Sequence, residues 1–323
     1  MSAKGGNRGT IKDFPGFKAS DDVQKLKAAM RGAGTDENAI AEILANRSNS
    51  QRQKIKLEYK SSVGKDLIDD LKSELSGNFK KVIVGLMMTA PEYDAYELRE
   101  AMKGAATDEG CLIEILASHS NQEIRTIVAT YKKNYDKSLE DDIVSDTSYM
   151  FQRVLVSLAT ANRDEGTTVN EELAKQDAQR KFKKAESKWL LLEEVFYIIC
   201  GFNSFKHMYQ LLFEEYKKVS NKDLEASIKS EMSGNLEDAL LAIVKCTKNK
   251  PAYFAERLYK SMKGLGTTDS ILIRVMVSRC EVDMLDIRSE FKKNYGKSLH
   301  SFIKGDTSGD YRNVLLKLCG GED

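Results

Sequence analysis

Four acidic residues recur along the chain at nearly constant steps. They are Glu74, Asp146, Glu231 and Asp306. The steps between them are 72, 85 and 75 residues, from 146 − 74, 231 − 146 and 306 − 231. A near-constant period with one carboxylate in each unit indicates an internal repeat that carries a repeated site.

A glycine-containing segment precedes three of these carboxylates. It reads Met30-Arg31-Gly32-Ala33-Gly34-Thr35 in the first repeat and recurs over residues 102–107 and 262–267. In each copy, 38 residues separate the final threonine from the acidic residue (36–73, 108–145 and 268–305). One copy would mean little, because many helices end in glycine. Three copies at one distance from a carboxylate indicate a functional site.

This pattern of residue types predicts a cation site. Glycine permits positive φ, so a turn with two glycines can direct several carbonyl oxygens toward one point. Carbonyl oxygens with one carboxylate form a hard-oxygen ligand set, which suits Ca²⁺. Such a site keeps a net charge of about +1, so we expect weak binding of Ca²⁺ alone. An anionic lipid would supply the missing charge and oxygen atoms, which makes binding cooperative in calcium and lipid.

The composition fits a helical protein and excludes several classes. Of the 323 residues, 31% are charged and three are proline, and the net charge is +1. This charge provides no basic field, so we expect no nucleic-acid partner. The five cysteines have no C-x-x-C spacing and are expected to be buried thiols in a reducing compartment. Without a signal peptide or a spanning apolar segment, we expect a cytoplasmic protein that is peripheral on membranes.

The periodicity of apolar residues predicts the all-α class, with about five helices in each repeat. The fourth repeat shows it most clearly, because Tyr253, Phe254, Leu258 and Met262 recur at the spacing of one helical face. The predicted ranges are an N-terminal tail over 1–15, repeats over 16–87 and 88–159, a polar linker over 160–171, and repeats over 172–246 and 247–323.

Helix starts can also be predicted from the sequence. Ser50 with Gln53, and Ser120 with Glu123, have the spacing of a capping box at the third helix of a repeat. In the glycine-containing segments, Thr35 and Thr267 are expected to cap the helix that follows.

These motifs resemble those of the annexin family, in which K-G-x-G-T is followed at a distance by Asp or Glu. The resemblance covers about residues 16–322, and the segments 303–311 and 318–321 are similar to those of short-tailed vertebrate annexins. It implies a slightly curved disc of four five-helix repeats with calcium loops on the convex face. It also implies Ca²⁺-dependent binding to acidic phospholipid membranes.

The resemblance further implies the calcium ligands, which are three main-chain carbonyls and one carboxylate in each of three repeats. Carried over by position, these are Met30, Gly32 and Gly34 with Glu74; Met102, Gly104 and Ala106 with Asp146; and Met262, Gly264 and Gly266 with Asp306.

The chain departs from the family pattern in two places. Ala106 stands where glycine is usual, and a positive φ there would cost about 1–2 kcal/mol. In the third repeat, Trp189-Leu190-Leu191-Leu192-Glu193 contains no glycine, so this repeat is expected to lack the main calcium site. Its leucines either insert into a membrane interface or extend the second helix into the repeat core.

Other functions remain open at this point. An enzyme that acts on lipid or phosphate and is docked by calcium is the first alternative, although no nucleophile–base pair is visible. A calcium-dependent ion-conducting assembly is the second, since Arg47, Arg274 and Arg279, with His119 and Asn203, match polar-channel positions of the family. Buried paired arginines are the simpler interpretation. Self-association on membranes is also left open.

Overall fold

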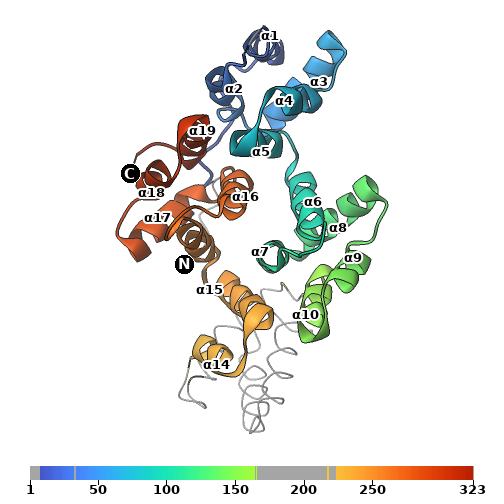
Figure 1. Ribbon diagram of the computed structural model, residues 1–323, viewed down its shortest axis with the longest axis vertical. Helices are drawn as coiled ribbons and strands as arrows, with labels where there is room; N and C mark the ends of the chain where they lie inside the picture. Colours follow the sequence, from blue (N-terminus) through green and yellow to red (C-terminus); the bar gives the residue numbers. More distant parts are fainter. Residues whose placement is uncertain (1–7, 33, 164, 166–216, 218–222, 323) are drawn as a thin grey trace. The chain divides into compact units, whose positions relative to one another are not determined.

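The computed structural model describes residues 8–32, 34–163, 165, 217 and 223–322. These residues form sixteen α-helices and no β-strand (Figure 1), which confirms the predicted all-α class. The chain divides into two compact units, Met1–Tyr93 with Pro251–Asp323, and Asp94–Lys250. The first unit contains the first and fourth repeats.

Repeats one and four each have five helices, in agreement with the sequence prediction. Repeat one contains α1 (Ala19–Ala29), α2 (Glu37–Leu44), α3 (Asn49–Val63), α4 (Leu67–Glu74) and α5 (Gly77–Leu86). Repeat four contains the end of α15 (Gly234–Met262), then α16 (Asp269–Arg279), α17 (Met284–Tyr295), α18 (Leu299–Asp306) and α19 (Gly309–Cys319).

The long helix α15 is broken at Asn249, where φ is −159° and ψ is 92°. Pro251 follows two residues later, and proline is tolerated in the first turn of a helix because its missing N–H has no intrahelical acceptor there. The segment before Asn249 therefore belongs to repeat three, and the segment after it opens repeat four.

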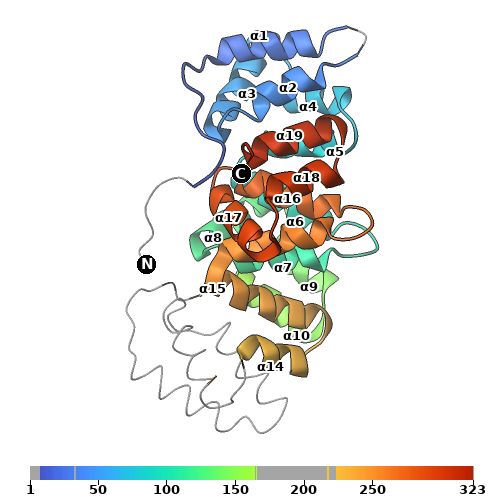
Figure 2. The same ribbon diagram turned by 90° about the vertical axis from the view of Figure 1, so that its left-hand side faces the viewer.

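The core of the first unit forms where α5 packs against α16 and α19, while α19 also packs against α2 (Figure 2). Ile83 of α5, Val275 of α16 and Leu315 of α19 are fully buried there. At the edge of this interface, Lys317 of α19 forms an ion pair with Glu42 of α2. The apolar faces of repeats one and four thus cover each other.

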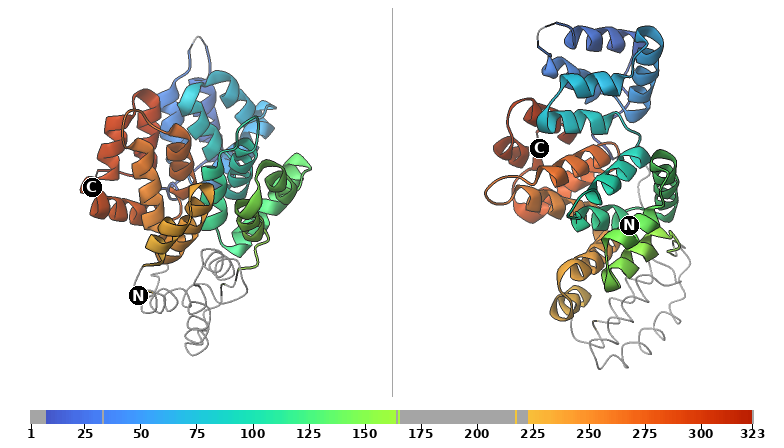
Figure 3. Two further views of the ribbon diagram at one scale, coloured as in Figure 1. Left: turned by 60° about the horizontal axis from the view of Figure 1, so that its bottom comes forward. Right: turned by 45° about the vertical axis from the view of Figure 1, so that its right-hand side comes forward.

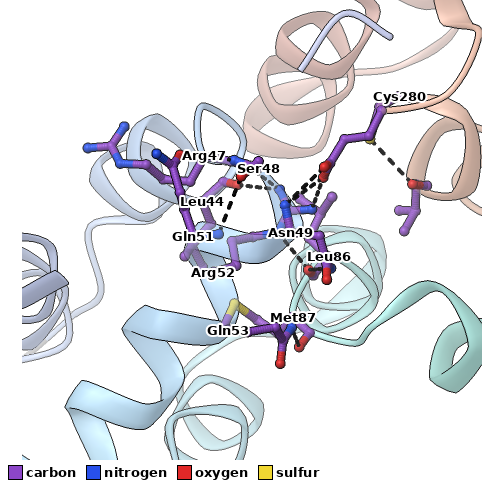
Figure 4. Close-up of polar contacts among 12 residues, drawn as sticks. Leu44, Arg47, Ser48, Asn49, Gln51, Arg52, Gln53, Leu86, Met87 and Cys280 are labelled. Atoms are coloured by element: carbon purple, nitrogen blue, oxygen red, sulfur yellow. Dashed lines mark hydrogen bonds and ion pairs between the residues drawn. The ribbon is translucent and has the colours of Figure 1, made fainter. Parts of the chain in front are cut away.

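A buried arginine joins two helix ends of repeat one to repeat four in the same unit. Arg52 of α3 donates to the carbonyls of Leu44 at 3.1 Å and Leu86 at 2.7 Å, which end α2 and α5 (Figure 4). It also pairs with Glu281 of repeat four at 2.6 Å. A cation beside the carbonyl ends of helices is stabilising because it opposes the negative pole of each.

The chain before α1 is an extended strap across both repeats of this unit. The Thr10 hydroxyl donates to the carbonyls of Cys280 at 3.2 Å and Leu318 at 2.5 Å. Arg8 pairs with Asp286 at 3.0 Å. These bonds fix the strap to repeat four before the chain enters repeat one.

In the second unit, the described helices belong to repeats two and three. They are α6 (Ala90–Ala101), α7 (Glu109–Ser118), α8 (Asn121–Tyr135), α9 (Leu139–Asp146), α10 (Tyr149–Ala159) and α14 (Leu224–Glu231), together with the start of α15. Repeat two is teal to green in Figure 3, and its five helices repeat the order seen in repeat one.

One of the two predicted capping boxes is confirmed and the other is wrong. At α8, the Ser120 side chain accepts from Glu123 N, and the Glu123 carboxylate accepts from Ser120 N. At α3, the box is formed by Ser48 with Gln51 rather than by Ser50 with Gln53. Both pairs have the required spacing, but α3 starts at Asn49, which places Ser50 inside the first turn.

The charged residues at the predicted channel positions are buried and largely paired within their own repeats. Arg47 binds Asp22 through two hydrogen bonds of 2.7 and 2.8 Å. Arg279 binds Asp283 at 2.8 Å, and Arg274 is buried. His119 lies 3.1 Å from Asp94. The simpler interpretation, buried paired charges, therefore applies to Arg47 and Arg279, whereas Asn203 lies outside the described residues.

Four cysteines are free and buried, as the sequence predicted: Cys111, Cys246, Cys280 and Cys319. Burial raises the pKa of Cys280 and of Cys319 to about 12, so the reactive thiolate is scarce near neutral pH. Cys200 lies outside the described residues.

Candidate functional site

The first candidate loop joins α1 to α2 in repeat one. Gly32 and Gly34 both have a φ of +103°, and a Cβ at either residue would meet open space. Their backbone conformation, rather than crowding, therefore selects glycine. Asp36 N donates to the carbonyl of Ala29 at 2.9 Å and closes the loop. The loop is thus a closed turn with exposed main-chain groups.

The same closure occurs in the other two glycine-containing segments. Asp108 N donates to Ala101 O at 2.8 Å, and Thr268 N donates to Ser261 O at 2.7 Å. Gly104 and Gly264 have φ values of +112° and +121°. All three loops have the same closing hydrogen bond and a positive φ at their first glycine. This agreement confirms that the sequence motif encodes one backbone shape up to that residue.

Each loop lies against the acidic residue that follows its threonine after 38 intervening residues. In repeat one, the Thr35 hydroxyl donates to the Glu74 carboxylate at 3.0 Å. In repeat two, Thr107 lies 3.5 Å from both the carbonyl and a carboxylate oxygen of Asp146. In repeat four, Thr267 donates to Asp306 O at 3.3 Å. The structure therefore brings together the loop and the acidic residue that the spacing paired.

The predicted role of Thr35 and Thr267 as helix caps is wrong. Asp36 caps α2 by accepting from Ala39 N at 2.9 Å, and Thr268 is the N-cap residue of α16. Thr35 and Thr267, each one position earlier, instead contact the acidic residues that end α4 and α18. They can do so because these two helices end beside the loops. Asp36 thus caps α2, and Thr35, the residue before it, contacts the end of α4.

The second loop differs from its siblings at Ala106. Gly34 and Gly266, at the corresponding position, have φ values of +103° and +86°. Across the described residues, the non-glycine residues with positive φ are Asp136, Tyr149 and Ala161. Ala106 does not adopt positive φ, so the expected steric cost does not arise and that expectation is corrected. The loop follows another path at this residue.

The loop residues 189–193 of repeat three lie outside the described residues. The acidic residue of this repeat is described, and α14 ends at Glu231 as α4, α9 and α18 end at their own acidic residues. Glu231 therefore has the same position in its repeat as the other three acidic residues have in theirs.

The donor set of the three loops fits a hard cation. Each has one carboxylate at a helix end and a turn of mostly exposed residues, and carboxylate and main-chain carbonyl oxygens suit Ca²⁺. Among the described residues, no group of three or more His, Cys, Asp or Glu side chains could hold a metal.

A cavity of about 540 Å³ adjoins the loop of repeat one. Its lining includes three basic side chains, one tyrosine and the candidate ligand: Lys27, Arg31, Lys65, Tyr59 and Glu74. Sequence reasoning missed this groove. The available signal was the i, i+4 spacing of Lys27, on the last turn of α1, and Arg31, just after the helix ends.

In repeat two, the corresponding place is closed by an ion pair. Arg99 lies three residues before Met102, as Lys27 lies three before Met30. Arg99 pairs with Asp142 at 2.9 Å, and the Tyr131 hydroxyl donates to the same carboxylate at 2.6 Å.

In repeat four, an aromatic cluster fills the corresponding place. We call Tyr259, Phe291, Tyr295 and Phe302 the repeat-four aromatic cluster. The rings of Tyr259 and Tyr295 are stacked with centroids 3.8 Å apart, and Phe291 lies edge-on to Phe302 with centroids at 5.1 Å. Tyr259 occupies the position of Lys27, three residues before Met262. Repeat four therefore has aromatic rings where repeat one has a cationic groove.

Comparison with known proteins defines the class. The Annexin family model matches residues 21–86, 93–158, 176–243 and 253–318. The chain therefore belongs to the annexin family, a family of proteins that bind phospholipid in a calcium-dependent way and are not enzymes.

Comparison with individual relatives shows which members of the annexin family the chain is similar to. The chain is 62% identical to Annexin A4 of Homo sapiens over 323 residues, which is all of both chains. The solved structure of annexin III aligns with a TM-score of 0.94 at 48% identity, covering 100% of both chains. A calcium-bound annexin (Sm)1 aligns with a TM-score of 0.83 at 36% identity, over 98% of this chain and 94% of that one. The chain is similar to Annexin A4 along its full length.

Membership in this family establishes the general function. The protein binds acidic phospholipid membranes with Ca²⁺ as its cofactor. Within the described residues, no helix is long and apolar enough to cross a membrane.

Proposed function

We propose that the three glycine-containing loops hold the calcium ions that bridge the protein to lipid headgroups. The ligands are the main-chain carbonyls and one carboxylate of each repeat: Met30, Gly32 and Gly34 with Glu74; Met102, Gly104 and Ala106 with Asp146; and Met262, Gly264 and Gly266 with Asp306. The observation that carries the proposal is the contact between each loop threonine and its distant acidic residue.

The charge of each site explains why calcium and lipid bind together. Three neutral carbonyls and one carboxylate leave a bound Ca²⁺ with a net charge of about +1 and with coordination positions open to water. An anionic phosphate fills these positions and neutralises the charge. By linkage, lipid then raises the affinity for calcium by the factor by which calcium raises the affinity for lipid.

The groove of repeat one adds side-chain cations to this arrangement. Lys27, Arg31 and Lys65 line a cavity that also reaches Glu74. A lipid phosphate bound to calcium at Glu74 would lie within the field of these three charges. Cations near an anionic membrane surface contribute about 1 kcal/mol each. We assign this groove to the anionic part of the headgroup.

Repeat three is proposed to lack the main site. Glu231 ends α14 in the same way as the other acidic residues, but residues 189–193 contain no glycine to form the loop. Three sites thus remain for four repeats. The predicted ranges of the tail, repeats and linker are likewise kept as proposals.

The location follows from the same chemistry. We propose a cytoplasmic protein that moves to membranes when calcium rises, because the weak sites fill only when calcium and anionic lipid are present together. A fluorescent fusion that stays uniformly distributed after calcium entry would contradict this. Self-association on the membrane is a further proposal, to be tested by cross-linking on vesicles with and without calcium.

The central experiment is vesicle cosedimentation at increasing calcium, with phosphatidylserine/phosphatidylcholine vesicles. Glu74→Gln with Asp306→Asn removes the charged ligand of two sites. The calcium midpoint should rise on the order of tenfold or more, since tenfold corresponds to about 1.4 kcal/mol. The matched control is Asp69→Asn with Asp136→Asn, two exposed carboxylates outside the loops. Equal midpoints for the double variant and the wild type would refute the ligand assignment.

A further inference from the structure

Tyr149 has a backbone conformation that its residue type disfavours. It opens α10 three residues after Asp146 with a φ of +53°. The residue three positions after the acidic residue in each other repeat is glycine, and Gly77, Gly234 and Gly309 have φ values of +60°, +63° and +60°. The fold therefore requires a left-handed residue at this corner, and repeat two uses tyrosine where its siblings use glycine.

Packing within the protein does not compensate this strain. A non-glycine residue with positive φ brings its Cβ too close to the following carbonyl oxygen. The Tyr149 side chain is 89% exposed, and it makes no hydrogen bond or ion pair with any described residue. An observed backbone outlier of this kind indicates a functional constraint.

The position of Tyr149 indicates what its ring contacts. Thr107 of the loop lies 3.5 Å from the Asp146 carboxylate, so the corner that follows Asp146 lies at the loop end of repeat two. Val144, on the last turn of α9, is 48% exposed and adds a second apolar side chain to this end. The exposed ring is therefore continuous with the loop end of repeat two, which the proposed function assigns to the lipid headgroups.

We propose that Tyr149 inserts its ring into the headgroup region of an anionic phospholipid bilayer. The inference rests on the proposed function, since it takes the loop end of repeat two as membrane-facing. Tyrosine suits this environment because its ring is apolar and its hydroxyl remains hydrated, and aromatic residues are enriched at membrane interfaces. The membrane contact, which is absent in the free protein, offsets the strain of the corner.

Tyr149→Gly separates this role from a structural one. It restores the residue type of the other three repeats, so strain is relieved and the thermal unfolding midpoint should rise or stay equal. Affinity for phosphatidylserine/phosphatidylcholine vesicles at saturating calcium should fall about threefold to tenfold, where tenfold corresponds to about 1.4 kcal/mol. Tyr149→Phe keeps the ring and should keep most of the affinity. Leu57→Ser, which changes an exposed apolar residue on α3, should bind like wild type.

A tryptophan probe measures insertion directly. Trp189 is the single tryptophan of the chain, so the probe is Tyr149→Trp in a Trp189→Phe background. Calcium with anionic vesicles should shift its emission to shorter wavelength and protect it from iodide, whereas calcium alone should do neither.

The outcomes are distinguishable from failure of the proposed function. If wild-type protein shows no calcium-dependent vesicle binding, the proposed function fails. If wild type binds and Tyr149→Gly binds equally well, or the probe emission stays the same on vesicles, the role of Tyr149 is refuted. A lower unfolding midpoint for Tyr149→Gly would also overturn it, because tyrosine would then stabilise the fold itself.

Discussion

Repeats one and four use the same loop and helix end but differ in what lies beside them. Both present a glycine turn, a threonine that contacts the acidic helix end, and a closing main-chain bond. Beside this shared part, repeat one has a groove lined by Lys27, Arg31 and Lys65, whereas repeat four has stacked aromatic rings.

The difference between repeats one and four separates what the proposed site requires of the main chain from what it requires of the side chains. In the proposed sites of these two repeats, calcium ligation depends on main-chain shape, and the shape is fixed by two glycines and one closing bond. The surface beside each loop depends on side chains, and these can change without moving the loop. Repeat one is therefore expected to bind an anion through calcium and through cationic side chains, while repeat four binds it chiefly through calcium and gains stability from its aromatic cluster.

The largest expected effect is on the free energy of unfolding. It distinguishes the surfaces beside the loops of repeats one and four. Phe291 is fully buried within the repeat-four aromatic cluster, so Phe291→Ala should lower the free energy of unfolding by about 3–5 kcal/mol. Tyr59, at the corresponding position in repeat one, donates to Asp70 at 2.7 Å. Tyr59→Phe loses only this bond and should cost about 1 kcal/mol. Urea unfolding measures both, and equal losses would contradict the comparison.

The second effect is on lipid binding. Replacing Lys27, Arg31 and Lys65 by glutamine removes three charges from the groove. At about 1 kcal/mol for each charge, affinity for anionic vesicles should fall up to about 100-fold, with a weaker dependence on salt.

The matched triple variant in repeat four is Lys260→Gln, Lys263→Gln and Lys297→Gln. It removes the same net charge around a site without the groove, so its loss of affinity should be several times smaller. Equal losses for both triple variants would show that only total charge matters, and the groove would then have no separate role.

The smallest effect concerns the loop of repeat two. Because Ala106 avoids positive φ, Ala106→Gly relieves no strain and increases the freedom of the unfolded chain. We expect a loss of up to about 1 kcal/mol in the free energy of unfolding. A clear gain in stability, measured by urea unfolding, would show that the alanine is strained after all.

The sequence was sufficient to predict the helical repeats because their signals are periodic and local. Apolar spacing located the helices, and the 38-residue interval paired each loop with its carboxylate. The loop shape that we propose for calcium ligation requires glycine, whose presence is visible in the sequence. The loop and its acidic partner could therefore be predicted from the sequence.

Other features depend on contacts that the sequence does not encode locally. Ser48 and Ser50 both offer a capping box, and only the observed start of α3 selects between them. Lys27 comes from α1 and Lys65 from the turn between α3 and α4, and their shared groove exists only after these segments pack. Tyr149 has positive φ because the corner demands it, although no tyrosine would be expected there.

The first unit is built from both ends of the chain, and this determines when it can be completed during synthesis. The apolar faces of α2 and α5 are covered by α16 and α19, which are translated after the whole of the second unit. The 157 residues from 94 to 250 separate the two parts, a delay of roughly ten to thirty seconds at typical elongation rates. Throughout that interval the ribosome-bound chain exposes half of a core. Repeat one is thus expected to need chaperones until repeat four has been translated.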